Sequence, residues 1–457
     1  MKNTKAYSWV PTLYFAEALP YVAVMSIVTI MYKTLGLSNA ELAFYTSWFY
    51  LPWVIKPFWS PFVDALKTKR WWILAMQILI GAGFAGVAFT ISTSFWLQAS
   101  IAFFWLIAFS SATHDIAADG FYILALDSHD QALYVGIRST FYRIATIFGQ
   151  GALVMLQGWM INGAPVPGSF GDFLSLVGIG SKQCEWTNLF STGDVPLSWC
   201  VVFVVLAVLF LSAFMYHKYK LPRPDSDIST VSADCGTKSM LKSQLGEFWQ
   251  TLKCFISKPQ IIVALAFMLL FRFPEAMLVK LASPFMLDSA SNGGLGLNTA
   301  EVGFVYGTIG IIGLTLGGII GGVAVSHGGL KKWLWPMVLS ISLPDAVYIY
   351  LSYFQDASML MINLCVFIEQ FGYGFGFTAY MLYLIYFSRG ERSTSVYAIC
   401  TGLMALGMML PGMMAGWMEE KVGYQMFFVI VMACTSITAI VSVLLKIDPE
   451  FGKKEKN

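Results

Sequence analysis

Charged residues are scarce in this sequence, and their scarcity excludes an ordinary soluble protein. Asp, Glu, Lys and Arg make up 12% of the 457 residues, whereas soluble domains carry roughly 25%. Hydrophobic residues make up 57%. They form apolar stretches of about 20 residues that recur along the whole chain, and each is long enough to cross about 30 Å of hydrocarbon. A soluble core would account for one such stretch, so the composition predicts a polytopic membrane protein.

Histidine and cysteine are also few, with four and seven residues, and they show no spacing typical of metal ligands. We therefore expect no metal and no cofactor, and nothing in the composition predicts a nucleic-acid partner. Cys184 and Cys200 fall in or beside one long polar loop, where they would form a disulfide if the loop faces an oxidising compartment. Two free thiols are the alternative.

The short polar start, Met1 to Ser8, runs directly into an apolar segment, which predicts an uncleaved first span rather than a signal peptide.

The apolar segments predict twelve membrane-spanning helices. Their ranges are residues 9–32, 41–63, 71–92, 96–126, 137–162, 197–216, 259–287, 299–325, 333–353, 358–388, 393–418 and 424–445. Each segment must satisfy its own backbone amides in the hydrocarbon, which a helix does. The alternating pattern of a membrane β-barrel is absent from the sequence. The expected fold class is therefore an all-α polytopic membrane protein.

Lys and Arg concentrate on one side of the predicted spans, as they do in cytoplasmic loops. If the N-terminus is cytoplasmic, the cytoplasmic segments hold twenty-one Lys and Arg residues. The opposite side holds only Lys33, Lys182 and Lys421. This asymmetry predicts that both termini face the cytoplasm.

Two of the predicted loops are long, residues 163–196 on the outside and residues 217–258 on the inside. The inner loop begins with two prolines, which do not continue a helix. It separates an N-terminal half, residues 1–216, from a C-terminal half, residues 259–457, and each half has six predicted spans. We expect residues 217–258 to be a cytoplasmic linker between the halves.

Short strings recur at equivalent positions of the two halves. Lys69-Arg70-Trp71-Trp72 matches Lys331-Lys332-Trp333-Leu334, and Arg138-Ser139-Thr140 matches Arg392-Ser393-Thr394. Their similar offsets favour a parallel duplication. Two six-helix halves related by an axis along the membrane normal describe the major facilitator fold.

Ionisable residues inside the predicted spans need a partner or a function, because each costs at least about 2.5–3.5 kcal/mol at the bilayer centre. One set lies near the predicted midplane and consists of Glu17, Arg272, Glu275, Asp345 and Glu369. Arg272 and Glu275 are spaced i,i+3, so we expect them to pair on one helix face. Pro274 between them is expected to loosen the backbone hydrogen bonding. We interpret this set as the site for substrate and coupling protons.

A second set lies in the predicted cytoplasmic third of the spans and consists of Lys56, Asp64, Asp115, Asp119 and Arg143. Arg143 is expected at about the depth of Asp119. We interpret this set as a gate that closes by ion pairing. The alternative for both sets is static pairing that only positions the helices.

Several other residues have simpler explanations. Glu41 and Glu301 stand near helix starts, where an acid suits the helix dipole, so we interpret them as caps. Lys280 is expected to point away from Glu275, toward the outside. Glycines cluster at 313–322 and predict close helix packing. Aromatic residues that flank the charged positions are candidates for stacking on a sugar ring: Tyr14, Trp48, Tyr373 and Tyr380.

Four strings in these spans match the pattern of a known family. They are Lys56-Pro57-Phe58-Trp59-Ser60-Pro61-Phe62-Val63-Asp64, Ser110-Ser111-Ala112-Thr113-His114-Asp115-Ile116-Ala117-Ala118-Asp119, Ala300-Glu301-Val302-Gly303 and Phe367-Ile368-Glu369-Gln370. Over most of its length the sequence resembles the muropeptide permeases (AmpG type) and, more distantly, the acetyl-coenzyme A transporters of the major facilitator superfamily. Lys56, Trp59, Asp64, Asp115, Asp119, Arg143, Glu275 and Glu369 fall where the family keeps like residues. His114, Glu17, Lys280 and Asp345 depart from the family pattern.

The resemblance implies proton-coupled import of an amino-sugar disaccharide or a muropeptide across a bacterial inner membrane. The expected partners are a small glycan, protons and the bilayer, and we expect a monomer. One alternative is a transporter of another oligosaccharide or of an acyl-coenzyme A anion. Another is a membrane enzyme that uses His114 and Asp115. Adjacent helical residues do not face each other, and no nucleophile, metal or nucleotide signature accompanies the two, so we favour a transporter.

Overall fold

The structure, a computed structural model, describes residues 6–165, 186–187, 191–224, 227 and 237–452. Side chains are described in these ranges except at 64–65, 128–129, 132, 135, 164–165, 186–187 and 237–245. Cys184 and the side chain of Asp64 therefore lie outside the described part, and the disulfide and the gate role of Asp64 stay predictions. Ten of the described helices are long and apolar enough to cross a membrane.

The N-terminal half contains nearly continuous helix with a few defined interruptions. Its elements are α1 (Ala6–Val22), α2 (Val28–Thr34), α3 (Asn39–Trp48), α4 (Leu51–Leu66), α5 (Lys69–Thr90), α6 (Trp96–Ala125), α7 (Ser128–Thr146), α8 (Val154–Asn162), the antiparallel two-residue strands β1 (Ala164–Pro165) and β2 (Trp186–Thr187), and α10 (Val195–Lys220). In β1 and β2, Ala164 pairs with Thr187 and Pro165 with Trp186.

The linker contributes one helix and the C-terminal half the rest. These elements are α11 (Thr237–Ile256), α12 (Ile261–Leu270), α13 (Phe273–Leu287), α14 (Thr299–Phe304), α15 (Ile311–Gly328), α16 (Leu330–Ser342), α17 (Ala346–Tyr353), α18 (Met359–Ser388) and α19 (Ser393–Val443), with short 3₁₀ turns at Ala290–Asn292 and Leu343–Asp345.

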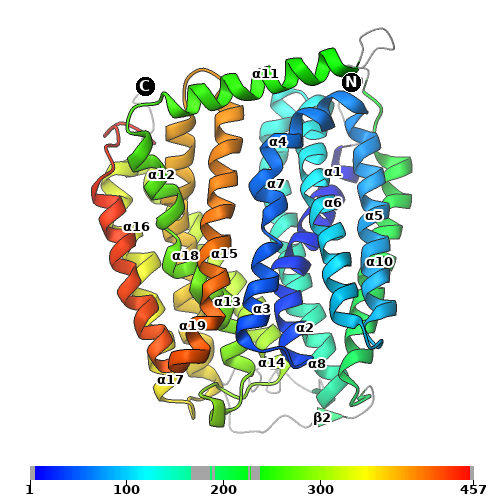
Figure 1. Cartoon of the computed structure of the whole chain (residues 1–457), viewed down its shortest axis with the longest axis vertical. Helices are drawn as coiled ribbons and strands as arrows, with labels where there is room; N and C mark the ends of the chain where they lie inside the picture. Colours follow the sequence, from blue (N-terminus) through cyan, green and yellow to red (C-terminus); the bar gives the residue numbers. More distant parts are fainter. Residues whose placement is uncertain (1–5, 166–185, 188–190, 225–226, 228–236, 453–457) are drawn as a thin grey trace.

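Helices α1–α10 gather on one side of the molecule and α12–α19 on the other (Figure 1). Helix α11 lies across one end of both groups, at the end where both chain termini lie, and β2 lies at the opposite end (Figure 1). This arrangement agrees with a linker between two bundles. Assignment of the α11 end to the cytoplasm rests on the Lys and Arg distribution and stays a prediction.

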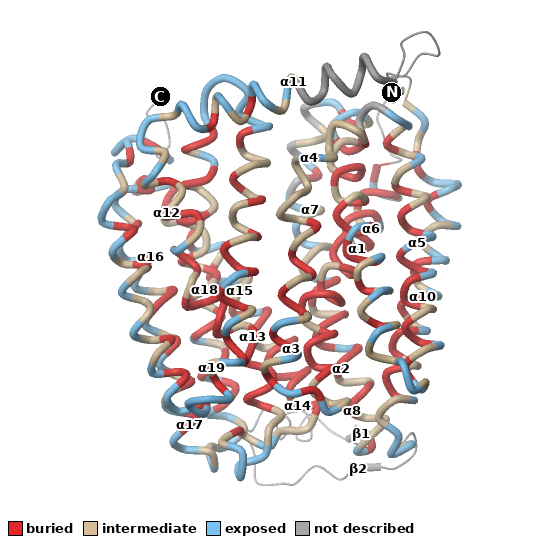
Figure 2. Tube along the Cα trace, in the orientation of Figure 1, coloured by how far each residue is buried: buried red, intermediate tan, exposed pale blue. Residues whose placement is uncertain are grey.

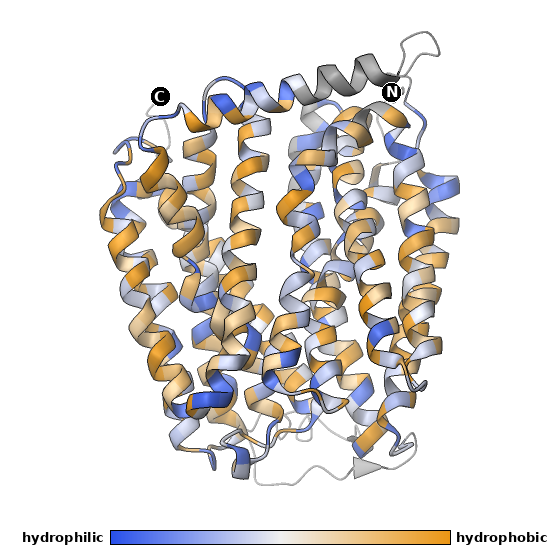
Figure 3. Ribbon diagram, in the orientation of Figure 1, coloured by the Kyte–Doolittle hydropathy of each residue, from blue (hydrophilic) through white to orange (hydrophobic). Residues whose placement is uncertain are grey.

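Buried residues follow the inward sides of both bundles (Figure 2). The outward faces are strongly apolar (Figure 3), and large side chains such as Phe89 and Ile262 are 78% and 80% exposed. A lipid environment accounts for these exposed apolar faces, because hydrocarbon replaces water there.

Most predicted spans agree with a helix, and two regions differ in detail. Residues 41–63 are not one helix but α3 and α4, which are interrupted between Trp48 and Leu51. The last two predicted spans lie together within α19, as two helices that meet at Gly423, where the backbone leaves helical geometry with φ of 75° and ψ of 163°. Only glycine adopts this conformation without steric cost, so the chain turns there without an intervening loop. The count of twelve spans stays a prediction.

Several spans leave regular α-helix near the middle of the molecule. The predicted seventh span breaks at Arg272 (φ −99°, ψ 15°), and Pro274 lies in the first turn of the helix that follows. Pro344 lies in the turn Leu343–Asp345 and breaks the predicted ninth span in the same way. π-Helical segments interrupt three further spans: Ala23–Ile27, Ile147–Leu153 and Val305–Gly310. Such segments are common at functional sites.

Close packing of α15 against α18 confirms the interpretation of the clustered glycines. A Cβ atom on Gly317 would lie 2.1 Å from the carbonyl oxygen of Phe371, and one on Gly374 would lie 2.1 Å from that of Leu314. Capping boxes likewise confirm the roles of Glu41 and Glu301, with Ser38 and Asn298 as the N-cap residues.

Candidate functional site

A central cavity lies between the two bundles. It consists of two adjoining spaces of about 770 and 470 Å³ that share the lining residues Tyr21, Tyr50, Trp53, Asp115, Arg272, Met404 and Met408. The larger space reaches the exposed residue Lys67, together with Lys69 and Asp227, so the cavity extends to the end covered by α11. These volumes are in the range of sites for small-molecule ligands.

The opposite end of the cavity is closed by a hydrogen-bonded network between the halves. Lys33 pairs with Asp288 (Nζ–Oδ2, 2.7 Å) and donates to Asn39 Oδ1 at 2.8 Å. Asn39 Nδ2 donates to Glu419 Oε2 (2.7 Å) and to the hydroxyl of Tyr424 (2.8 Å). The Tyr424 hydroxyl donates to Asp288 Oδ2 at 2.7 Å. We call these five residues the closed-end network.

Backbone contacts make the same closure tight. A Cβ atom on Gly416 would lie 1.8 Å from the carbonyl oxygen of Asn39, and one on Gly158 would lie 2.2 Å from the amide nitrogen of Ala300. Each contact joins one half to the other, so any larger side chain at these glycines would force the halves apart.

The closed-end network is not among the residues predicted from the sequence, although the sequence carries a signal for it. Lys33 was noted only as a rare cation on the outer side. Asp288 and Glu419 lie at the outer ends of their predicted spans, so the sequence already placed two acids at the same depth as Lys33.

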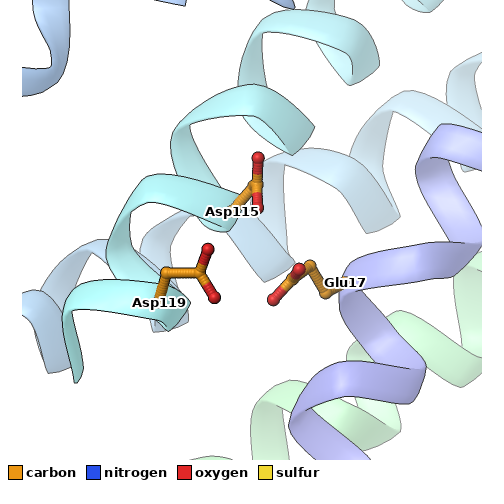
Figure 4. Close-up of side chains that lie close together, drawn as sticks. All are labelled: Glu17, Asp115 and Asp119. Carbon is orange, nitrogen blue, oxygen red and sulfur yellow. The ribbon is translucent and has the colours of Figure 1, made fainter. Parts of the chain in front are cut away.

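Three carboxyl groups of the N-terminal half converge beside the cavity. Asp115 and Asp119, one turn apart on α6, face Glu17 on α1 (Figure 4). One oxygen of each lies within 4.8 Å of the others. We call Glu17, Asp115 and Asp119 the N-terminal carboxyl cluster. Glu17 and Asp115 line the smaller cavity space, and Asp115 and Asp119 line the larger one.

Two cations offset the charge of this cluster. Lys56 on α4 forms a short ion pair with Asp115. Arg138 on α7 pairs with Asp119 at 2.9 Å, and the hydroxyl of Tyr14 donates to the same carboxylate oxygen at 3.1 Å. The guanidinium of Arg138 also lies 4.4 Å from the centre of the Tyr14 ring, a cation–π contact.

The structure corrects two details of the predicted sets. Arg143, interpreted as part of the ion-paired gate at about the depth of Asp119, lines the smaller cavity space, and the arginine that pairs with Asp119 is Arg138. Glu17, grouped by depth with Glu275, lies instead with Asp115 and Asp119. Both errors arise because depth along a span does not say which helix is adjacent. The Lys56 and Arg138 pairs each lie within one half, so the described residues form no ion pair between the halves at the α11 end.

Replacing Lys56 with methionine removes one of the two cations that offset three converging carboxyl groups. Lys56 and Asp115 are only partly buried, at 28% and 22% side-chain exposure, so we expect a loss of about 1–3 kcal/mol in folding stability. The additional Asp115→Asn substitution should restore much of it. Thermal melting of purified protein measures both effects. Lys331→Met, at an exposed lysine, is the matched control, and a double variant no more stable than Lys56→Met would contradict the pairing.

A second group of three carboxyl groups lies inside the C-terminal half. Glu275 on α13, Asp345 in the turn before α17 and Glu369 on α18 bring one oxygen each within 4.8 Å of one another. We call these the C-terminal carboxyl cluster. None of the three lines the central cavity, whereas Tyr306, Gln370 and Tyr373 do. Gln370 Nε2 donates to both oxygens of Glu369, at 3.0 and 3.2 Å, and to the Tyr306 hydroxyl at 3.3 Å. Gln370 therefore separates the cluster from the cavity.

Arg272 does not form the expected pair with Glu275. The helix break at Arg272 turns its side chain toward α18, where it donates a short hydrogen bond to the hydroxyl of Tyr373. Its guanidinium lies 4.7 Å from the centre of the Phe377 ring. Arg272 lines both spaces of the cavity. The i,i+3 expectation fails because it assumes a continuous helix between the two residues.

Lys280 bridges the halves below the cavity. Its Nζ donates to Thr46 Oγ1 on α3 at 3.1 Å and lies 5.1 Å from the centre of the Tyr50 ring. It points away from the C-terminal carboxyl cluster, as expected. Among the described residues no carboxylate lies within ion-pairing distance of this lysine.

Two bundles of membrane-length helices around a central cavity, open at one end and sealed at the other, are typical of a membrane transporter. The Major Facilitator Superfamily family model matches residues 12–410. This chain belongs to that superfamily of transporters, as the repeated strings predicted, and it is a multi-pass membrane protein.

Relatives and solved structures agree with this assignment. The anhydromuropeptide permease of Escherichia coli (strain K12) is 23% identical over 97% of this chain and 80% of its own length. The putative transporter AmpG 4 of Rickettsia conorii is 23% identical over 90% of this chain and 89% of its own length. Among solved structures, a D-xylose-proton symporter aligns over 98% of this chain and 99% of its own with a TM-score of 0.66 at 12% identity. The nucleoside transporter NupG aligns over 96% of this chain and 98% of its own, with a TM-score of 0.61 at 13% identity.

Proposed function

We propose that this protein is a proton-coupled symporter that imports a small glycan, a peptidoglycan-derived amino-sugar disaccharide or muropeptide, by alternating access. The observation that carries the proposal is the central cavity, which is open at one end and closed at the other by the closed-end network. The printed names of the relatives, anhydromuropeptide permease and AmpG, support the substrate class. In this proposal the cavity faces the cytoplasm, and residues 1–216 and 259–457 move against each other about residues 217–258.

The chemistry of the cavity wall suits a sugar that carries a carboxylate. Arg143 and Arg272 supply guanidinium groups, which bind carboxylates through two parallel hydrogen bonds. Tyr21, Trp53 and Tyr373 supply aromatic rings that can stack on the apolar face of a sugar ring. Lys56, Asp115 and Asp119 line the space that reaches the open end, and they are proposed to act as the gate.

Glu275 and Glu369 are proposed to carry the coupling proton. Both are 2% exposed, so both are costly as unpaired anions. Gln370 lines the cavity and donates a hydrogen bond to Glu369. The same side chain therefore contacts the proposed substrate space and a proposed proton-binding group. Binding of the substrate against Tyr306 and Gln370 would therefore alter the surroundings of the carboxyl groups that take up the proton.

Replacing Glu275 or Glu369 with glutamine should abolish proton-coupled uptake. Glutamine mimics a permanently protonated carboxyl group, so the carrier can bind substrate but cannot release a proton. In proteoliposomes we expect substrate-driven alkalinisation of the outer medium to vanish in both variants, while exchange of labelled for unlabelled substrate continues. Asp356→Asn, at an exposed acid, is the control. Unchanged proton flux in both variants would remove these residues from the coupling mechanism.

The substrate itself is tested by uptake into proteoliposomes with an imposed inward proton gradient. We expect accumulation of anhydromuramyl disaccharides, with or without peptide, and its loss when the gradient is collapsed. Chitobiose, simple hexosamines and acetyl-coenzyme A are the comparison substrates. Accumulation of acetyl-coenzyme A alone, or uptake that is indifferent to the gradient, would overturn the proposed function.

A further inference from the structure

The C-terminal carboxyl cluster has the geometry of a cation site. Glu275, Asp345 and Glu369 come from three separate elements, and one oxygen of each lies within 4.8 Å of the other two. An ion at the centre of such a triangle is at most about 2.8 Å from each oxygen. This distance is close to the roughly 2.3–2.6 Å between Ca²⁺ and its oxygen ligands. No rearrangement of the backbone is needed to bring the ligands together.

Two members of the cluster lack hydrogen-bond partners. Glu275 is 2% exposed, and neither of its carboxylate oxygens has a donor. Asp345 is 3% exposed, and its Oδ2 has none. A buried polar group without a partner costs several kcal/mol, far more when it is charged. The protein leaves these oxygens unpaired at a point where they face one another, which indicates a ligand that supplies positive charge.

Protein cations do not fill this role among the described residues. No Lys, Arg or His nitrogen lies within ion-pairing distance of the cluster, and the guanidinium of Arg272 is directed to Tyr373 and Phe377. The remaining polar groups that face the cluster are the hydroxyl of Tyr348, 3.5 Å from Glu369, and Gln370 with Tyr306 behind it. The N-terminal carboxyl cluster differs, because Lys56 and Arg138 already pair with it.

We propose that the C-terminal carboxyl cluster binds a sodium ion, which occupies it in place of protons when its carboxyl groups are ionised. A monovalent ion is favoured because it must leave again in each transport cycle. Sites rich in carboxylates hold calcium with dissociation constants as low as about 10⁻⁹–10⁻⁸ M, which would make its release slow. Magnesium is disfavoured because it gives up its water ligands reluctantly, and the cluster is almost fully buried.

The route for the ion passes Gln370. This side chain lines the cavity and bonds Glu369, so its rotation would connect the cluster to the central cavity. The inference rests on the proposed function in one respect: the groups that bind sodium are those proposed to carry the coupling proton. It adds a second coupling ion that competes with the first.

Equilibrium binding of ²²Na⁺ to the purified full-length protein tests the inference directly. We expect saturable binding that unlabelled Na⁺ displaces and K⁺ does not, together with a rise in melting temperature in NaCl relative to choline chloride. Glu275→Gln, Asp345→Asn and Glu369→Gln should each weaken ²²Na⁺ binding at least tenfold. The control variant Asp356→Asn should bind sodium as the parent protein does.

Several results would overturn the proposal. These are the absence of ²²Na⁺ binding to the parent protein, equal displacement by K⁺, binding of Ca²⁺ or Mg²⁺ alone, or sodium binding that survives all three substitutions. The first three results are measured on the parent protein, so they remain informative even if a variant fails to fold. Proton-driven glycan uptake in sodium-free medium separates the two proposals. If that uptake persists without any sodium binding, only the ion site fails; if sodium binds but no glycan accumulates, only the proposed function fails.

Discussion

Alanine at Arg272 is expected to weaken binding of a carboxylate-bearing glycan by about 30-fold to several thousand-fold. Removing one partner of a buried, hydrogen-bonded charge pair costs about 2–5 kcal/mol, and each 1.4 kcal/mol is a factor of ten in affinity. Arg272 is 7% exposed and lines both spaces of the cavity. Lysine at this position should give an intermediate loss, because it keeps the charge but not the paired hydrogen bonds.

Isothermal titration of purified protein with an anhydromuramyl disaccharide measures this effect. Arg389→Ala is a matched control, because Arg389 is an exposed arginine that lies over the Phe451 ring away from the cavity. The Arg272→Ala substitution should weaken binding of a neutral analogue, which lacks the carboxylate, far less than binding of the charged glycan. Equal losses for the charged and the neutral ligand would show that Arg272 only supports the cavity wall through Tyr373.

Valine at Gly416 is expected to hold the protein open at the end that is now closed, and transport should fall by up to about 100-fold. The valine side chain would clash with Asn39, because a Cβ atom on residue 416 would lie 1.8 Å from the carbonyl oxygen of Asn39. Overpacking typically costs about 1–3 kcal/mol, and a penalty near 3 kcal/mol on one of two states shifts their ratio by roughly two orders of magnitude. The closed-end network would break because Asn39 is its central member.

A cysteine at position 47 reports on this change. Ser47 is fully buried beside Gly412 at the contact between the halves, so Ser47→Cys should react slowly with a membrane-impermeant maleimide in a background without the native cysteines. Adding Gly416→Val should raise the labelling rate at least tenfold. Gly322→Val is the matched control, because no atom lies within 4 Å of its Cβ position. Unchanged labelling with intact uptake would show that closure at Gly416 is not part of the transport cycle.

The two predictions address opposite ends of one cycle. In the proposed function Arg272 lies where the substrate would be held, and Gly416 lies where the halves would separate to admit it. If both effects are observed, the site of binding and the site of gating are distinct, as alternating access requires.

The membrane class and most of the helices could be predicted from the sequence. Hydrophobic length alone gives α6 and α18 to within one residue of the predicted ranges, because every backbone amide in lipid must be bonded within its own segment. The strings repeated between the halves favoured the major facilitator fold, and the resemblance to the muropeptide permeases predicted the superfamily. Pro274 also marked the helix break beside Arg272, since proline cannot complete the backbone hydrogen bonding.

Which charged groups meet depends on how the helices pack in three dimensions. The sequence supplied Asp119, Arg138 and Arg143, and the packing of α1 against both α6 and α7 brings Arg138 to Asp119. Tyr14 meets the same carboxylate across 105 positions of the chain, and Asn39 meets Glu419 across 380. Helical periodicity fixes the face and depth of a side chain but carries no information about which helix lies opposite it. That choice is made by the packing of whole helices, through contacts such as Gly416 on Asn39, and the cavity, its closed end and both carboxyl clusters follow from it.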